Sequence, residues 1–132
     1  MKSRTKPVLL AIAVALASGG LGFYAGLRQG SYVMGTLASQ NRISEALSDV
    51  RTTVPALEAS ESSVLRQQVA VQLRTALFAL DAYSGAVPFW KCSDQDRAAL
   101  LSASTYIGAH SDARVFNSDQ PLVRGTQFCK AR

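Results

Sequence analysis

The hydrophobic pattern begins with a long run that contains no charged side chain. Residues 7–27 include no Lys, Arg, Asp, Glu or His, and the apolar stretch 8–27 is 20 residues long. A helix that rises about 1.5 Å per residue crosses the roughly 30 Å hydrocarbon layer of a bilayer in this length. We therefore predict a transmembrane signal-anchor helix over residues 8–27, in contact with membrane lipid.

The charges that precede this run predict its orientation. Lys2, Arg4 and Lys6 stand before it, and basic residues are retained on the cytoplasmic side of a bacterial inner membrane. Residues 1–7 are thus predicted to form a cytoplasmic basic N-terminus. Residues 28–132 are predicted to form a periplasmic helical domain.

The same segment also contains a candidate cleavage site. Ala15, Leu16 and Ala17 form a small-x-small pattern after a basic start and a short apolar stretch, which is typical of a secretory signal peptide. Cleavage after Ala17 would leave an apolar tail at the start of the mature protein, so an uncleaved anchor is favoured and cleavage stays open. Both alternatives place the later residues in an oxidising compartment.

Beyond Leu27 the apolar spacing changes to that of amphipathic helices. Leu37, Ile43, Leu47 and Val50 recur at roughly helical intervals. This predicts that the first helix continues or restarts until Pro55 interrupts it, because the residue before a proline is disfavoured in helical geometry.

Residues 60–84 have the clearest helical period in the chain, and a serine is expected to cap the start of this helix. We expect it to end at Gly85 and to fold back on the preceding helix as an antiparallel hairpin. A thinner second stripe predicts that it is covered on more than one side. The main face consists of Leu65, Val69, Leu73, Leu77 and Leu80, with Ala76 and Tyr83 beside it, and the second stripe of Val64, Val71 and Phe78.

A further helix is predicted to start at Ser93, because a serine with an acidic residue three positions later is typical of a capping box. Its apolar side carries Leu100, Ala103 and Ile107, and it should end within residues 108–112.

The C-terminal tail shows no helical period. Residues 117–121 and Gly125 are interpreted as turn signals, and short extended pieces are expected at 114–116 and 127–129. The predicted fold class is therefore all-α: one N-terminal transmembrane helix followed by a small helical hairpin or bundle, with a disulfide-tied irregular tail.

The two cysteines, Cys92 and Cys129, both follow the apolar run. An even pair in an oxidising compartment predicts a disulfide. Closing a loop of this length would contribute about 4 kcal/mol in the chain-entropy model. A reactive thiol is the alternative, although no CxxC pair supports it.

The net charge of +5 does not predict nucleic-acid binding. Three of these charges precede the apolar run, and from Arg28 onward 11 basic residues stand against 9 acidic ones, a net of +2. The basic residues are scattered, without the interleaved aromatics that phosphate backbones require. We expect no nucleic-acid partner.

Candidate catalytic groups are few. The best assembly is His110, Ser111 and Asp112, but adjacent residues at a helix end point in different directions, and His110 is better explained by the helix dipole. Asp94 and Asp96 are interpreted as helix-start residues. Zinc needs more ligands than one histidine and two cysteines provide. We therefore expect no enzyme, no cofactor and no metal site.

Small residues recur on one side of the predicted span. Gly22, Gly26 and Gly30 are spaced by four, with Ser18 one turn earlier. Small residues allow helix backbones to approach closely in lipid, where no hydrophobic force drives pairing. This face is predicted to pack against another membrane protein or against a second copy of the chain.

Two adjacent aromatic residues, Phe89 and Trp90, precede Cys92 on a predicted loop. A rigid loop with large aromatic area is typical of a partner contact. The alternative is that both side chains plug the end of the helical hairpin, over Leu77 and Leu80.

These features predict a single-pass inner-membrane protein whose periplasmic helical domain acts as an interaction or assembly subunit of an envelope complex. The alternative is a cleaved, secreted or periplasmic binding protein, such as an inhibitor or immunity protein. An enzyme is the least favoured class.

Overall fold

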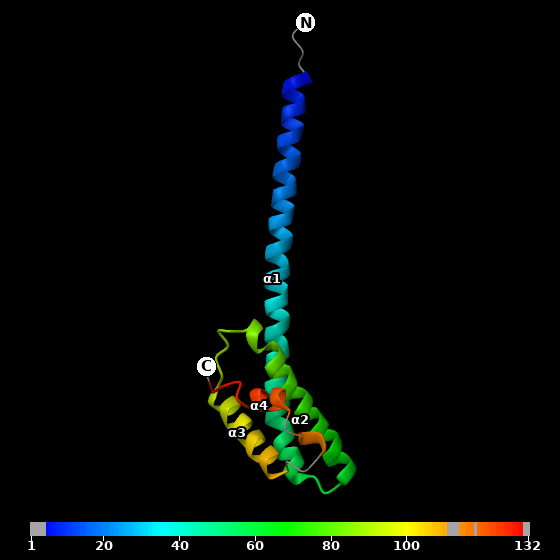
Figure 1. The fold of residues 1–132 in the computed structure, drawn as a ribbon, viewed down its shortest axis with the longest axis vertical. Helices are drawn as coiled ribbons and strands as arrows, with labels where there is room; N and C mark the ends of the chain where they lie inside the picture. Colours follow the sequence, from blue (N-terminus) through cyan, green and yellow to red (C-terminus); the bar gives the residue numbers. More distant parts are fainter. Residues whose placement is uncertain (1–4, 111–113, 118, 131–132) are drawn as a thin grey trace. The chain divides into compact units, whose positions relative to one another are not determined.

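The computed structural model describes residues 5–110, 114–117 and 119–130, with side chains throughout except at 5–7, 9, 11 and 13. In these ranges the chain forms α1 (Thr5–Ala59), α2 (Ser63–Tyr83), α3 (Asp94–Ala109) and α4 (Gln120–Thr126) (Figure 1). Two single 3-10 turns, η1 (Ser84–Ala86) and η2 (Arg114–Phe116), lie between them. None of these residues is in a strand, so the all-α prediction is confirmed.

The chain divides into two compact units, Met1–Leu37 and Ala38–Arg132. Every large hydrophobic side chain described in the first unit is exposed, from 46% at Val33 to 73% at Tyr32. The second unit contains the last part of α1 and the later elements. All of the buried residues in the described ranges belong to the second unit.

The predicted transmembrane span lies in the first unit. Within the described residues, no helix has a segment that is both long enough and apolar enough to cross a bilayer. The side chains of residues 9, 11 and 13, which belong to the predicted span, lie outside the described part of the chain. The structure therefore confirms a helix over residues 8–27 but does not confirm a transmembrane one.

The end of α1 corrects a prediction, because the helix continues through Pro55 to Ala59. Proline lacks an N–H group, so the carbonyl of Arg51 loses its usual helical partner at a cost of about 3 kcal/mol. Leu57, two residues later, is only 2% exposed, and burying a leucine contributes about 2 kcal/mol. Packing of the last turn thus offsets much of the cost of the proline.

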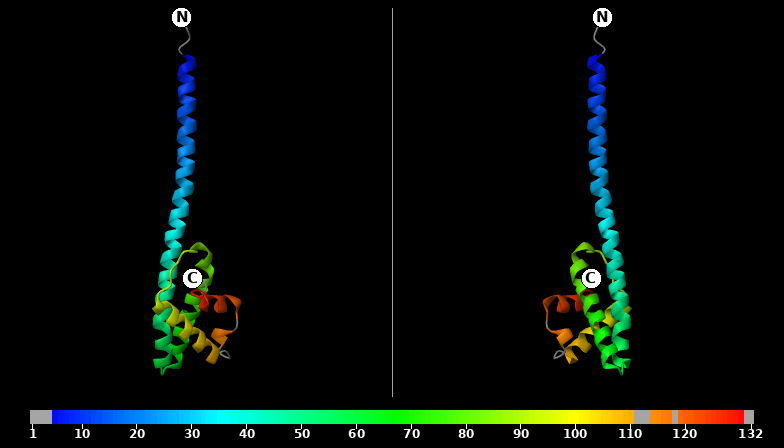
Figure 2. Two further views of the ribbon diagram at one scale, coloured as in Figure 1. Left: turned by 90° about the vertical axis from the view of Figure 1, so that its left-hand side faces the viewer. Right: turned by 90° about the vertical axis from the view of Figure 1, so that its right-hand side faces the viewer.

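In the second unit, α2 folds back along the end of α1 as the predicted antiparallel hairpin (Figures 1 and 2). The connection is residues 60–62, and the Ser62 hydroxyl caps α2 by accepting a hydrogen bond from the N–H of Leu65. The amide of Gln72 donates to the carboxylate of Asp49 across the pair at 3.3 Å.

The buried face of α2 is shorter than predicted. Leu73, Leu77 and Leu80 are fully buried, but Leu65 is exposed. The predicted second stripe is also wrong for Val64 and Val71, which are exposed. The C-terminal segment contacts α2 at Arg74 and Leu77, in the later turns, where the buried leucines are.

α3 begins and ends as predicted. Ser93 and Asp96 form a capping box: the Ser93 N–H donates to the Asp96 carboxylate at 2.8 Å, and the Asp96 N–H donates to the Ser93 hydroxyl at 3.1 Å. Leu100 and Ala103 are buried on its inner face, with Ile107 partly buried beside them.

The C-terminal tail is more regular than predicted, because it contains α4. Asp119 is the N-cap and Pro121 lies in the first turn, where a missing N–H costs nothing because that group has no helical partner. The proline therefore starts a helix and does not mark a turn. Residues 114–116 are a 3-10 turn and 127–129 belong to a turn, so the extended pieces expected there are not formed.

One continuous core holds α1, α2, α3 and the C-terminal segment of the second unit together. The buried apolar residues include Ile43, Leu47, Val50, Val54, Leu57, Leu73, Leu77, Leu80, Leu100, Phe116, Leu122 and Phe128.

Candidate functional site

The predicted disulfide is present. Cys92, just before α3, is bonded to Cys129, and their Cα atoms are 5.9 Å apart. Both cysteines are buried, and the chain has no free thiol. The bridge ties the turn after α4 to the start of α3, so the alternative of a reactive cysteine finds no support in this structure.

The loop that precedes Cys92 separates the two aromatic residues. The N–H of Trp90 donates to the carbonyl of Val87 at 3.1 Å, which closes a turn. Trp90 packs against the core, and its indole N–H is buried without a hydrogen-bond partner in the described ranges. Phe89 instead is 92% exposed. A partner contact stays a prediction, and Phe89 is the aromatic residue whose side chain is available for it.

The glycine face of the first unit is open in the single chain. A Cβ atom placed on Gly22, Gly26 or Gly30 would meet nothing within 4 Å. The hydroxyl of Ser18 donates to the carbonyl of Ala15 in its own helix. The predicted helix–helix interface therefore stays a prediction, because the described residues show no contact at the glycines of this face.

Gly125 is a close-contact residue that the sequence pattern did not reveal. A Cβ atom at this position would lie 2.2 Å from the carbonyl oxygen of Leu77, so α4 touches the backbone of α2 there. The turn predicted at Gly125 is therefore wrong, because Gly125 is a buried residue inside α4.

Two arginines hold the C-terminal segment against α2. Arg74 donates to the carbonyl of Val115 and to Asp119, and its guanidinium lies over the ring of Phe78. Arg124 donates to both carboxylate oxygens of Asp81, at 2.8 and 2.9 Å.

The pair between Arg124 and Asp81 also affects titration. The hydrogen bonds from Arg124 lower the pKa of the Asp81 carboxyl below its ordinary value of 3.8. Partial burial opposes this effect, and the positive charge of Arg124 adds to it.

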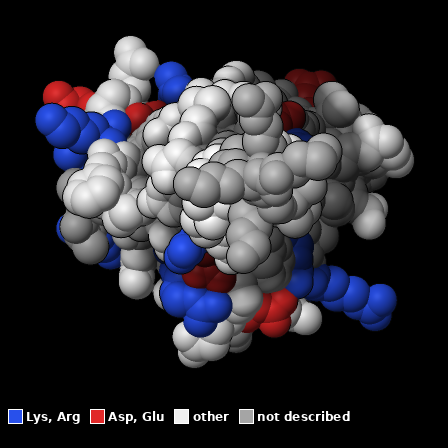
Figure 3. Space-filling model, turned by 90° about the horizontal axis from the view of Figure 1, so that it is seen from above, with Lys and Arg blue, Asp and Glu red and all other residues white. Residues whose placement is uncertain are grey.

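Charged side chains are distributed over the surface of the second unit. In the view of Figure 3, basic side chains lie in several separate places, with acidic side chains beside some of them. Arg42, Arg51, Arg74, Arg97 and Arg124 each form an ion pair with a carboxylate. A nucleic-acid surface would instead present unpaired basic groups in a stripe.

Asp96 caps the start of α3 as predicted and also contacts a residue that is distant in sequence. Besides the capping box, its second carboxylate oxygen lies 3.4 Å from Nε of Arg51 on α1, while Asp96 itself is only 5% exposed. Asp94 forms an exposed ion pair with Arg97. Both carboxylates thus have structural partners at the start of α3.

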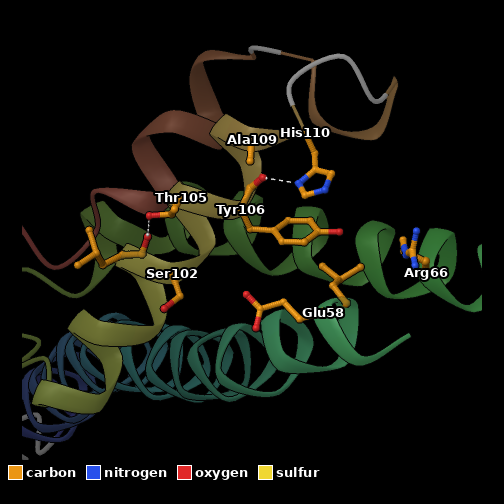
Figure 4. Close-up of a pocket in the computed structure, with 9 residues that line it drawn as sticks. Glu58, Arg66, Ser102, Thr105, Tyr106, Ala109 and His110 are labelled. Atoms are coloured by element: carbon orange, nitrogen blue, oxygen red, sulfur yellow. Dashed lines mark hydrogen bonds between the residues drawn. The ribbon is translucent and has the colours of Figure 1, made fainter. Parts of the chain in front are cut away.

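His110 lies at the end of α3 beside an open hollow of about 640 Å³ (Figure 4). Its ring stacks on Tyr106, with centroids 4.2 Å apart, and its Nδ1 lies 2.9 Å from the Tyr106 carbonyl. Ser111 and Asp112, the other members of the weighed triad, lie outside the described residues. The hollow is lined by Leu57, Glu58, Arg66, Leu101, Ser102, Thr105, Tyr106, Ala109 and His110.

This hollow has the chemistry of an ordinary surface depression. Glu58 and Arg66 on its rim are exposed, and Arg66 donates to the carbonyl of Ser60. Groups able to act as nucleophile and base should lie within hydrogen-bond reach of one another, and no such pair is found among its described side chains. Nor do three metal-ligating side chains gather anywhere in the described ranges.

Comparison of the chain with family models, with curated proteins and with solved structures finds no match.

Proposed function

We propose that this protein is an interaction or assembly subunit of a bacterial envelope complex, anchored in the inner membrane by its N-terminal helix. The described apolar side chains of the first unit carry this proposal, because each large one is exposed in the part of the chain that the structure describes. A helix that is apolar on all sides is stable where lipid or another protein surrounds it. Residues 7–27 also lack any charge.

The location follows from the two ends of the apolar run. Lys2, Arg4 and Lys6 before it favour a cytoplasmic N-terminus. The bridge between Cys92 and Cys129 suits an oxidising compartment, because disulfides are rare in a reducing cytosol. The periplasm is the compartment in which both conditions are met.

Interaction is favoured over catalysis by the kind of surface that the protein presents. Phe89 is exposed on a loop held next to the disulfide, and the glycine face leaves room for a second helix. Large exposed aromatic residues and small helix faces are typical of protein contacts. The partner is therefore expected to be another membrane protein or a second copy of this chain.

The anchor is tested by the mass and the membrane retention of the protein after expression from its full sequence in a bacterium. We expect the intact mass to include residues 1–17 and the protein to stay in the membrane after alkaline carbonate washing. Protease added to spheroplasts should then digest the second unit. A mature protein that lacks residues 1–17 and is released as a soluble form would replace the anchor by the alternative, a secreted or periplasmic binding, inhibitor or immunity protein.

The glycine face is tested by a matched pair of substitutions. Gly26→Leu would place a large side chain on this face, whereas Gly20→Leu adds the same side chain about 140° away from the centre of the face around the helix. Crosslinking in intact cells should show that Gly26→Leu reduces the yield of the partner or of the dimer and that Gly20→Leu does not. Equal yields from both variants would remove the glycine face from the proposal.

A further inference from the structure

A groove runs between α3 and the C-terminal segment of the second unit. It consists of two hollows of about 370 and 240 Å³ that share Ser104, Thr126 and Lys130. Small-molecule sites have volumes of roughly 300–1,000 Å³. The two adjoining hollows, which we call the α3–α4 groove, therefore reach the size of a ligand site.

One wall of the groove is a single face of α3. Its residues recur every three or four positions, so they lie in a row along the helix. The row extends for about 16 Å, given a rise of 1.5 Å per residue from the first member to Gly108. It is formed by Arg97, Leu100, Leu101, Ser104, Ile107 and Gly108.

The opposite wall is formed by α4 and the turn after it, and α4 packs against α2. Gly125 allows α4 to touch the backbone of α2 at Leu77, and Arg124 pairs with Asp81 on the same helix. Leu122 is buried at the base of the groove, but Val123 on its rim is 44% exposed. On the other rim Leu101 is 67% exposed.

The groove differs in charge between its two ends. Arg97 lines only the hollow beside Cys129, and Lys130 lines both hollows where they adjoin. Ile107 and Phe116 line only the other hollow. No carboxylate is among the described residues that line either hollow. Arg97 pairs with Asp94, but both side chains are exposed, and such a pair is held weakly.

We infer that the α3–α4 groove binds a single-chain amphiphile with an anionic head, its chain over Ile107 and its head beside Lys130. An apolar chain suits the leucine, isoleucine and valine side chains, and a carboxylate or phosphate suits the two cations. The disulfide anchors the cationic end through Cys129. This inference goes beyond the proposed function and concerns only the second unit, so it does not depend on the membrane anchor.

The test uses the full chain in lipid nanodiscs and a photoreactive dodecanoate that carries a diazirine at the end of its chain. A dodecyltrimethylammonium with the same diazirine is the matched control of opposite charge. After illumination and trypsin digestion, mass spectrometry locates the labelled peptides, including 98–114 and 115–124. The apolar first unit should be labelled by both probes, which makes it an internal reference.

We expect the anionic probe to label peptides 98–114 and 115–124 about five- to tenfold more than the cationic probe, the ratio that one or two partly screened charge contacts provide. Lys130→Glu should remove this preference. Val123→Asp, on the rim, should reduce labelling by both probes, whereas Val71→Asp, exposed on α2 outside the groove, should leave it unchanged.

Competition identifies the head group. Unlabelled dodecanoate and dodecyl phosphate should each displace the anionic probe, and the stronger competitor distinguishes a carboxylate from a phosphate head. Trp90 fluorescence would confirm that each variant remains folded, because this single tryptophan packs on the core. Equal labelling by the two probes, labelling confined to the first unit, or displacement only by an acidic peptide would overturn the inference.

Discussion

The two parts of α1 contain similar apolar residues but differ in whether those residues are buried. In the second unit, Ile43, Leu47, Val50 and Val54 recur every three or four positions and are at most 3% exposed. In the first unit, apolar residues occupy all sides of the helix, and each large one that the structure describes is exposed. A stripe can be buried against one neighbouring helix, whereas large apolar side chains on all sides of a helix cannot be buried by one neighbour.

The glycines of the two units show the same contrast. Gly22, Gly26 and Gly30 form a regular pattern, yet a Cβ atom added at any of them would meet nothing within 4 Å in the described part of the chain. Gly125 belongs to no pattern and is in direct contact with the backbone of α2. A repeat of small residues shows where a second helix could pack closely. Whether a helix does pack there depends on the tertiary structure.

The largest expected effect concerns the disulfide, which lies within the second unit and has no counterpart in the first. Cys129→Ser removes the only disulfide, and a bridge that closes 37 residues contributes about 4 kcal/mol by restricting the unfolded chain. We expect a marked loss of stability in the second unit, measured by chemical denaturation with Trp90 fluorescence. Far-ultraviolet circular dichroism should show that helix in the first unit persists. Loss of the helical signal together with the fluorescence signal would mean that the helix of the first unit depends on the fold of the second unit.

The second prediction compares one leucine from each unit. Leu77→Ala empties a fully buried position and should lower the free energy of unfolding by about 3 kcal/mol. Leu21→Ala, at a residue that is 72% exposed, should leave the denaturation curve of the second unit unchanged. If Leu21→Ala lowered it by a similar amount, the first unit would have to contact the core.

The third prediction applies one substitution to two glycines. Gly125→Ala forces a Cβ atom against the Leu77 carbonyl and should cost about 1–3 kcal/mol through overpacking. The Cβ atom of Gly26→Ala would meet nothing within 4 Å among the described residues, so this variant should instead favour its helix by roughly 0.5–1 kcal/mol. Thermal unfolding followed by Trp90 fluorescence should therefore change only for Gly125→Ala. An unchanged curve for that variant would mean that α4 can move away from α2 without loss.

The smallest effect concerns the pair that holds α4 to α2. Because the folded pKa of Asp81 is depressed, its stabilising contribution is present above the unfolded pKa and is lost as the pH falls through the folded pKa. Asp81→Asn should therefore reduce stability at pH 7 and have little effect near pH 2. The difference between wild type and variant, measured by urea denaturation from pH 7 to 2, should shrink below about pH 4. A difference that stays constant over this range would show that the charge of Asp81 is not involved.

Local signals predicted the helices of the second unit well. The caps at Ser62 and Ser93 and the period along α2 depend on residues close in sequence, so they are visible without a structure. The disulfide followed from the presence of only two cysteines. Pro55 and Pro121 were misinterpreted because a proline can end a helix, lie within it or start it, and packing decides among these.

The surface groups were harder to predict because they depend on contacts between distant residues. Phe89 and Trp90 are neighbours in sequence, but a turn exposes one and packs the other on the core. The α3–α4 groove exists because α4 packs on α2, and nothing in the residues of α3 alone would reveal it.

The sequence by itself determined the helical class, the charge-free N-terminal run and the pairing of Cys92 with Cys129, since each follows from residue type and spacing. Only the tertiary structure decided that α1 continues through Pro55, that Gly125 is the glycine in close contact and that a groove opens beside Lys130. Local preferences are small in energy, and burial against residues far away in the chain outweighs them wherever the two disagree.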